Sequence, residues 1–512
     1  MKSVRKSVSL VLALCLMAST ALAGCGNTAP ASAAPAAASA APAASTAEAS
    51  SAEASSAPKE TVTLKLMTGD KKIQGLDRVQ EAVNAYLKEK NTGLQIAWET
   101  YTWDELKQKT ATMLQTGQEV DIINTSSWLT PGYVAHCQKN ELTDITKYIN
   151  DSQYKEVVDI IGKDFLDGTK VNGKYYGMPT NKEKAHNFGF LCQTSELKKL
   201  NIDPKSIKTM EDLEKYFDKV KADGLIPVCA AQMDSPYKFL DWDAFDADIS
   251  PFAFDPKDET KIVNPFTADK TIAFYKKMKT WHDKGYFSPD VLTSKGQESD
   301  MASGKYFCGS WSLMPGKAIS ESTSLKLDLT QIDITPVEKT NRETLGALLA
   351  IPASSKHPDE AFKFISMLYT DKTLINLMTY GVEGKDYTKK SDNVITVSKD
   401  TDFSSAGGWI MGNQFNNYLT DAQPETLFKD IEAYNGSAKV LDDLGFVYDS
   451  SKCKTEYGAC QAVVNKYYPQ LFFGTSDVDA TMVKFNSELK AAGIDKLLSD
   501  VQSQYDNWNK SK

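Results

Sequence analysis

A local group of four carboxylates, Asp241, Asp243, Asp246 and Asp248, could carry acid–base or cation chemistry. Two carboxylates about 5–9 Å apart can hydrolyse a glycosidic bond. Acidic side chains spaced by two and three residues can also bind calcium, but the glycine and the final glutamate of an EF-hand loop are missing here. Nothing else in the sequence supports catalysis, so we expect no catalytic residue, no metal and no cofactor.

The charge and the histidine content argue against two further classes of protein. Lys plus Arg number 58, Asp plus Glu number 67, and the formal net charge is −9. An acidic chain lacks the basic surface that releases counterions from nucleic acid, so we expect no nucleic-acid partner. The chain has only four histidines, which are far apart in the sequence and argue against a histidine-rich metal site.

Tryptophans at expected strand ends and in loops are the candidates for ligand contact. A large flat ring can cover the apolar face of a ligand while neighbouring polar groups fix its orientation. The tryptophans in such positions are Trp103, Trp128, Trp242, Trp311 and Trp409. The alternative for each is packing, for example against the following helix for Trp128 or as an anchor of its own loop for Trp242.

An alternation of strand and helix patterns positions several of these residues. Residues 62–67, 94–101 and 120–123 are typical of strands, and residues 76–90 and 103–114 are typical of helices with one apolar face. This order predicts a parallel sheet with right-handed crossovers, and ligands bind beyond the carboxyl ends of such strands. The candidate residues at or just after those ends are Asp70, Trp103, Thr125 and Trp128.

The remainder of the folded chain mixes strand and helix patterns. Thr209 to Asp212 form a capping box, residues 345–351 are typical of an apolar strand, and Pro358 begins a helical pattern. Apolar periodicity around Phe485 and Val501 predicts a helical C-terminus. We therefore expect an α/β fold with a mainly helical C-terminal extension.

The N-terminus is typical of a secretory signal peptide, residues 1–24, with a basic start and an apolar run too short to span a membrane. The sequence LAGC that ends at Cys25 resembles the lipobox of bacterial lipoproteins. This resemblance implies cleavage before Cys25 and a diacylglyceryl group on its thiol, and two acyl chains give stable attachment. Residues 25–59 are almost entirely Ala, Ser, Pro and Thr after Cys25 and predict a disordered tether.

Six cysteines follow the tether at wide spacing. Export permits disulfides, but this low content is not a disulfide framework, so we expect most of these thiols to be free and buried. They are Cys137, Cys192, Cys229, Cys308, Cys453 and Cys460.

The order of these features resembles the extracellular solute-binding proteins of ABC importers, in particular the sugar-binding type. Beside the lipobox and the tether, the matching segments are Gly173–Pro179 (GKYYGMP), Asn201–Pro204, Met301–Trp311, and Leu345–Pro352 with the following Pro358. Leu377–Tyr387, Gly412–Gln414 and Leu444–Phe446 resemble a subgroup that has a characteristic C-terminal domain.

The resemblance implies two α/β lobes joined by a hinge that the chain crosses more than once, with the ligand between the lobes. The expected first lobe comprises residues 60–180 and 337–357, the second lobe residues 181–336 and 358–400, and a C-terminal region, residues 401–512, packs on the lobes. The crossings are expected near residues 178–188, 335–344 and 351–357.

From the resemblance we expect a monomeric, non-catalytic protein that captures an oligosaccharide between closing lobes and delivers it to the permease subunits of an ABC importer. It would act on the extracellular face of the bacterial membrane, anchored at Cys25. The expected ligand-binding residues are Asp70, Trp103, Thr125, Trp128, Lys182, Trp242, Trp311 and Trp409, with Trp128 and Trp311 on opposite lobes. A peptide or another polar solute is the alternative ligand, a surface glycoside hydrolase is the alternative class, and a solvated hinge is the alternative for Lys182.

Overall fold

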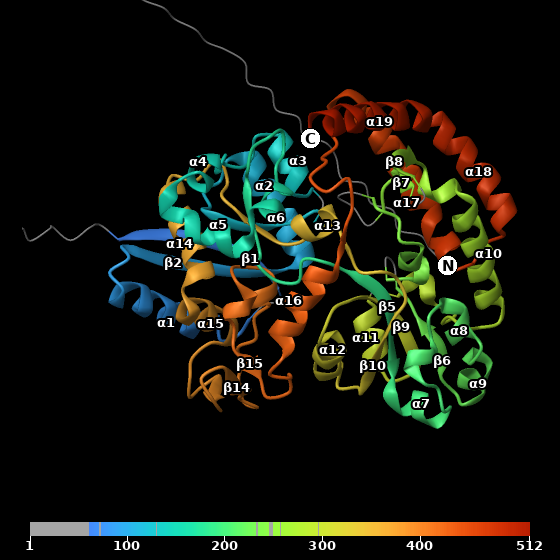
Figure 1. Ribbon diagram of the computed structural model, residues 1–512, viewed down its shortest axis with the longest axis horizontal. Helices are drawn as coiled ribbons and strands as arrows, with labels where there is room; N and C mark the ends of the chain where they lie inside the picture. Colours follow the sequence, from blue (N-terminus) through green and yellow to red (C-terminus); the bar gives the residue numbers. More distant parts are fainter. Residues whose placement is uncertain are drawn as a thin grey trace, which may run out of the picture. The chain divides into compact units, whose positions relative to one another are not determined.

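The computed structural model describes residues 61–70, 73–129, 131–231, 234–244, 249–255, 258–294 and 296–512 (Figure 1). The expected signal peptide, the lipid anchor at Cys25 and the tether lie outside the described residues, as do Asp246 and Asp248. Within the described part of the chain, no helix combines the length and the apolar character needed to cross a membrane.

The first lobe is built on a five-stranded sheet in the order β2-β1-β3-β12-β4. Its strands are β1 (Val62–Asp70), β2 (Leu94–Thr102), β3 (Ile122–Thr125), β4 (Gly177–Pro179) and β12 (Leu348–Ala350). β1 runs parallel to β2 and β3, whereas β12 runs antiparallel to β3 and β4. The expected β-α-β-α-β unit is therefore confirmed, with the third strand shifted by two residues.

The helices between these strands follow the apolar spacing of the sequence. Helix α1 (Leu76–Glu89) buries Val79, Val83 and Leu87 on one face. Helix α2 (Trp103–Thr116) begins at a capping box formed by Thr102 and Glu105 and ends at Gly117. The remaining helices before β4 are α3 (Tyr133–Gln138), α4 (Thr146–Ile149), α5 (Lys155–Ile161) and α6 (Lys163–Asp167).

The second lobe is built on a four-stranded sheet in the order β10-β5-β9-β6. Its strands are β5 (Asn187–Gln193), β6 (Ile226–Cys229), β9 (Tyr306–Leu313) and β10 (Leu329–Asp333). Its helices are α7 (Thr194–Lys199), α8 (Met210–Glu214), α9 (Phe217–Ala222), α10 (Asp269–Asp283), α11 (Gln297–Ala302) and α12 (Lys317–Leu325). All six described cysteines are buried, and none of them forms a disulfide.

Helices α14 (Pro358–Thr370) and α15 (Lys372–Tyr380) differ from the expected lobe assignment, which placed residues 358–400 in the second lobe. Their buried side chains, among them Phe362, Ile365 and Ile375, share one hydrophobic core with Leu64 and Leu66 of β1. Their apolar periodicity predicts that one face is buried, but it does not specify which sheet that face covers.

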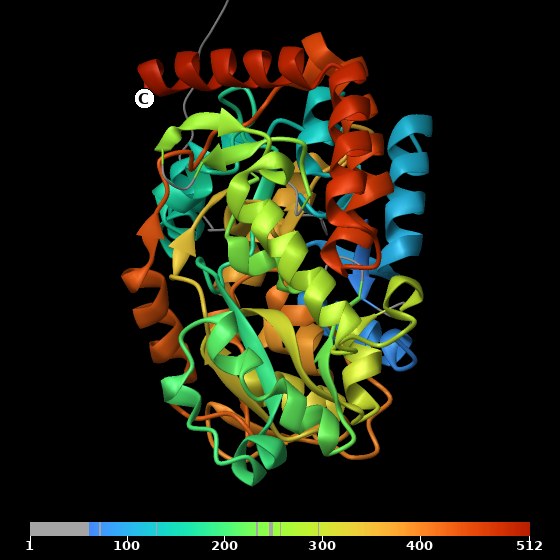
Figure 2. The same ribbon diagram turned by 90° about the vertical axis from the view of Figure 1, so that its right-hand side faces the viewer.

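The C-terminal helices complete the core of the second lobe. They are α17 (Lys454–Phe472), α18 (Val478–Ala491) and α19 (Ile494–Ser511). Figure 2 shows these red helices beside the green helix α10, which packs against α17 and α18. Phe472, Phe485 and Tyr505 share a single core with Phe190 of β5 and Phe274 of α10, so these helices extend the second lobe itself. A hairpin of β7 (Ala253–Asp255) and β8 (Asp258–Val263) packs on α19.

The chain passes between the two sheets at residues 180–186 and 334–347, as expected for the first two crossings. His186 and Glu338 form an antiparallel bridge there. The third expected crossing, at residues 351–357, is absent from the described residues, because α14 stays with the first lobe. The chain instead passes to the C-terminal helices through α16 (Leu427–Ser437) and β16 (Lys439–Val440), which pairs with β11 (Glu338–Lys339) of the second crossing.

Side chains hold this third connection to both crossings. The Asn435 Oδ1 atom accepts a hydrogen bond of 2.6 Å from the backbone N–H of Lys184. Asn341, which is fully buried in α13 (Asn341–Thr344), accepts from the N–H of Gly445 at 2.8 Å and donates to the carbonyl of Phe446 at 3.0 Å. Residues 435–446 are therefore part of the hinge, whereas the C-terminal helices that follow belong to the second lobe and Phe403, Ile410 and Met411 belong to the core of the first.

Candidate ligand-binding site

Trp103, Trp128 and Trp409 come together at the carboxyl edge of the first sheet, although they belong to three separate segments. The ring centroids of Trp103 and Trp128 are 4.9 Å apart with planes at 73°, and those of Trp103 and Trp409 are 5.6 Å apart at 46°. Trp128 and Trp409 are 6.5 Å apart at 31°. Trp409 is 38% exposed and the other two rings are half-buried. We call this group the tryptophan triad.

The position of Trp103 depends on Gly69 in β1. A Cβ atom built on Gly69 would lie 1.9 Å from the Trp103 ring, so the ring lies directly on the backbone of the strand. Only glycine permits this approach. The N–H of Gly69 donates to the Asn124 Oδ1 atom at 3.2 Å, which also fixes the end of β1 relative to β3.

Trp128 is fixed to the second crossing through its indole nitrogen. Its Nε1–H donates a hydrogen bond of 2.7 Å to the carbonyl oxygen of Gly346. The polar end of the ring is thus satisfied inside the protein, while the rest of the ring packs beside Trp103.

Trp409 is carried by a loop, residues 406–414, that follows the carboxyl edge of the first sheet. The N–H of Ala406 donates to the Asp70 carboxylate at the end of β1. The Asn124 Nδ2 atom, in β3, donates to the carbonyl of Ile410 at 3.0 Å. The backbone N–H of Asn181, beyond β4, donates to the carbonyl of Gly412, and its backbone carbonyl accepts from the N–H of Gln414, both at 2.9 Å. The three polar residues hold the loop at three strand ends, and we call them the edge clamps.

The Asp70 carboxylate, which we expect to bind ligand hydroxyls, also accepts a hydrogen bond from the N–H of Ala406 in the Trp409 loop. Thr125 lies at the end of β3 and is 3% exposed, and its hydroxyl has no hydrogen-bond partner among the described residues. Lys182 lies in the first crossing, where its ammonium pairs with the Glu183 carboxylate. Among the described residues, neither Thr125 nor Lys182 forms a hydrogen bond with a tryptophan of the triad.

Trp242 lies in the second lobe, after the 3₁₀ turn η3 (Pro236–Leu240). Its Nε1–H donates to the Thr271 hydroxyl at 3.0 Å, and the Lys270 ammonium lies 3.8 Å from the ring centroid. The ring lines a cavity of about 40 Å³ together with Phe188 of β5 and Arg342 of the second crossing. Trp242 is thus a second-lobe aromatic residue beside the hinge.

Trp311 does not occupy the expected position opposite Trp128. It lies within β9, between β5 and β6, and is 7% exposed. Its neighbours are core residues such as Leu191, Cys229 and Met301. The sequence Gly309-Ser310 predicts a turn before Trp311, but the strand continues through both residues, and the ring is a core residue.

A group of charged residues lies where the two crossings meet the second lobe. The His186 Nδ1 atom is 2.8 Å from Glu343 Oε1, and its Nε2 atom is 3.9 Å from Asp241 Oδ1. Burial lowers the pKa of His186, whereas the negative charge of Glu343 and the hydrogen bond to it raise the pKa. The two contributions of Glu343 together exceed the effect of burial, so the pKa of His186 is raised. The pKa of Glu343 is correspondingly lowered, because its histidine partner and the N–H of Thr340 outweigh its burial.

Glu338, in the same group, has a strongly shifted pKa. Burial and the negative charge of Asp241 raise it to about 7, against the opposing attraction of His186 and Lys439. The charge state of this crossing therefore changes near neutral pH.

The arrangement of two sheets joined by crossings, with aromatic residues at the strand ends beside the hinge, defines a two-lobed binding protein. The sequence profile of the family described as bacterial extracellular solute-binding protein matches residues 81–403. The chain belongs to this family. A second profile, a domain of unknown function (DUF3502), matches residues 443–510.

Similar proteins include a carbohydrate ABC transporter substrate-binding protein of Streptococcus pneumoniae, 26% identical over 87% of this chain and 90% of its own length. Among solved structures, the N-glycan transport solute-binding protein NgtS of Streptococcus pneumoniae is 24% identical, with a TM-score of 0.78 over 88% of this chain and 99% of that one. The alginate-binding protein AlgQ2 is 15% identical, with a TM-score of 0.63 over 87% and 98%. These structures confirm the two-lobed fold.

Sequence reasoning identified all three triad residues but missed the groups that position them. Gly69, Asn124 and Asn181 stand at or next to strand ends, where short polar residues and glycine are common. For Gly69, the available signal was its place directly before Asp70, at the end of a predicted strand. The bonding of Asn124 and Asn181 to a loop more than 230 residues away has no local signature.

We predict that Gly69→Ala displaces the Trp103 ring, because the new methyl group would overlap it. Overpacking of this kind costs about 1–3 kcal/mol, and the near-ultraviolet circular dichroism of the coupled indoles should change. Gly458→Ala is the control, since its Cβ meets no heavy atom within 4 Å in helix α17. An unchanged spectrum and unchanged stability for Gly69→Ala would show that the ring does not depend on this glycine.

We also predict a pH-dependent stability difference between the wild type and Glu338→Gln. The folded pKa of about 7 exceeds the ordinary value of 4.5, so the proton on Glu338 stabilises the folded state at low pH. This contribution is lost as the pH rises from about 4.5 through 7. Melting temperatures measured from pH 4.5 to 8 should therefore fall further for the wild type than for Glu338→Gln. Parallel curves would contradict the raised pKa.

Proposed function

We propose that this protein captures an extracellular oligosaccharide between its lobes and hands it to the permease of an ABC importer, without chemical change to the sugar. The observation that carries the proposal is the tryptophan triad at the carboxyl edge of the first sheet. Aromatic faces cover the apolar C–H faces of sugars, and the partly exposed Trp409 leaves such a surface accessible.

The ligands of related structures support a carbohydrate. NgtS has been crystallised with Man1GlcNAc and with Man5GlcNAc, and FusA of Streptococcus pneumoniae with kestose. A peptide or another polar solute is the alternative ligand. In our proposal the sugar contacts Trp103, Trp128 and Trp409 from the first lobe and Trp242 from the second, and Thr125 and Lys182 lie at the margin of the same site.

We further propose that the protein works as a monomer on the extracellular face of the membrane, held by a diacylglyceryl group on Cys25. The lipobox supports the anchor, and the family supports an extracellular place of action. The Ala/Ser/Pro-rich segment that follows would then link the anchor to the folded lobes.

A panel of ligands tests the proposed function. Calorimetric titration with Man5GlcNAc, kestose, alginate oligosaccharides and a short peptide should give saturable binding to an oligosaccharide, which is recovered uncleaved. Trp409→Ala should weaken that binding roughly 5- to 150-fold, the equivalent of about 1–3 kcal/mol. Its melting temperature should change little, because the ring is 38% exposed.

Tyr154→Ala is the control, since Tyr154 is a half-buried ring of the first lobe that contacts Tyr148 and Phe362 and not the triad. Equal losses of affinity in both variants, cleavage of the glycan, or binding of the peptide alone would each contradict the proposed function.

The anchor is tested by Cys25→Ser in the full chain. The variant should lose lipid labelling and appear in the medium or as an uncleaved precursor, because the thiol that carries the lipid is gone. Membrane retention of a processed, unlipidated Cys25→Ser chain would contradict the anchor.

A further inference from the structure

The C-terminal helices contact the second-lobe segment that carries Trp242. The profile match to residues 443–510 names no role for them. Two aromatic contacts link these helices to residues on either side of Trp242, one through Tyr237 and one through the strand β7.

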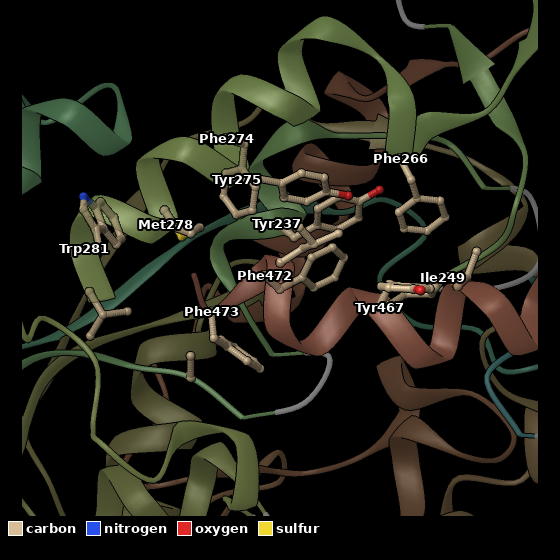
Figure 3. Packing of buried hydrophobic residues seen from close by; sticks show 14 of the residues in the cluster. Tyr237, Ile249, Phe266, Phe274, Tyr275, Met278, Trp281, Tyr467, Phe472 and Phe473 are labelled. Atoms are coloured by element: carbon tan, nitrogen blue, oxygen red, sulfur yellow. The ribbon is translucent and has the colours of Figure 1, made fainter. Parts of the chain in front are cut away.

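The first contact is a stack between Tyr237 and Phe472. Their ring centroids are 4.0 Å apart and their planes differ by 18°. Tyr237 lies in η3, five residues before Trp242, and Phe472 is the last residue of α17. Figure 3 shows the two rings between α10 and α17, next to Phe274 and Tyr275. Phe472 is fully buried, so the stack is part of the core rather than a surface contact.

The second contact involves Asp243, the residue that follows Trp242 in the sequence. The N–H of Phe254, in β7, donates to the carbonyl oxygen of Asp243 at 2.9 Å. The Phe254 ring in turn packs edge-on against Tyr505 of α19 at 4.6 Å. The residue next to Trp242 is therefore tied through β7 to the last helix of the chain.

The indole itself is held by α10, which lies against α17. Thr271 binds its nitrogen, and Lys270 covers one ring face and donates to the carbonyl of Leu240 at 2.5 Å. The three elements α10, η3 and β7 contact the segment of Trp242 and also pack on the C-terminal helices, so the position of Trp242 depends on those helices through three contacts.

We propose that residues 443–510, which contain the C-terminal helices, are a positioning element that fixes Trp242 and thereby the second-lobe side of the ligand site. Phe472 is the main positioning residue, acting through Tyr237. This inference rests on the proposed function for its consequence on binding, but the placement of Trp242 itself can be measured without any ligand.

Hydrogen exchange of the full chain without ligand tests the placement. Phe472→Ala removes the stacked ring, and Val464→Ala serves as control, since Val464 is equally buried in the same helix but belongs to none of these contacts with Tyr237. Exchange in residues 236–244 should rise at least tenfold in Phe472→Ala relative to Val464→Ala. Tyr237→Phe, which keeps the ring, should match the wild type. Equal exchange in Phe472→Ala and Val464→Ala would overturn the proposal.

Binding tests the consequence. With the best-binding sugar of the panel, Phe472→Ala should weaken affinity of the folded protein about tenfold, while Tyr237→Phe and Val464→Ala should not. The double variant Phe472→Ala/Trp242→Ala should bind no more weakly than Trp242→Ala, because Phe472 acts through Trp242. Additive losses, or an unchanged affinity in Trp242→Ala, would overturn the inference. Absence of binding by the wild type to any panel sugar would instead refute the proposed function, while the exchange result would still decide the placement.

Discussion

The hydrogen bonds that the edge clamps make to the loop of residues 406–414 are the constraint on which the candidate site depends. Asp70, Asn124 and Asn181 bind a segment that is 336, 286 and 232 residues away in the contacts Asp70–Ala406, Asn124–Ile410 and Asn181–Asn413. Without these bonds nothing in the local sequence would bring Trp409 to Trp103 and Trp128. The triad is therefore a product of tertiary structure.

The clamps explain why polar side chains stand at the buried edge of an otherwise apolar sheet. A buried amide is costly unless it is hydrogen-bonded, and departure of the loop would remove the acceptors of the Asn124 and Asn181 side-chain amide groups. A hydrogen bond that is made adds little to overall stability, whereas a buried polar group left without a partner is costly. The clamps therefore mainly select one register of the loop. The same reasoning applies to Asn341 at the hinge, which is fully buried and bonded to Gly445 and Phe446.

Much of the first lobe could be predicted from the sequence, because its strands and helices carry regular periods of two and 3.6. The α1 face of Val79, Val83 and Leu87 and the capping box at Thr102 are local signals that the structure confirms. The partners of such faces are not local. The apolar faces of α14 and α15 were evident, but their packing on the first sheet was not.

The candidate site shows the same division. Tryptophans near strand ends could be recognised, and three of them meet. Trp311 could not be distinguished from them, because the preceding Gly-Ser pair is typical of a turn. In the structure the buried strand β9 continues through this pair and through Trp311. The positioning of Trp242 by the C-terminal helices depends on contacts such as Tyr237–Phe472, which join residues far apart in the chain.

A crystal structure of the protein with its best-binding oligosaccharide would test the central claim most directly. We expect a sugar ring to lie against the triad, with its C–H face on Trp409, and the loop of residues 406–414 to keep its bonds to Asp70, Asn124 and Asn181. A glycan bound elsewhere, with the triad rings untouched, would contradict the assignment of this site.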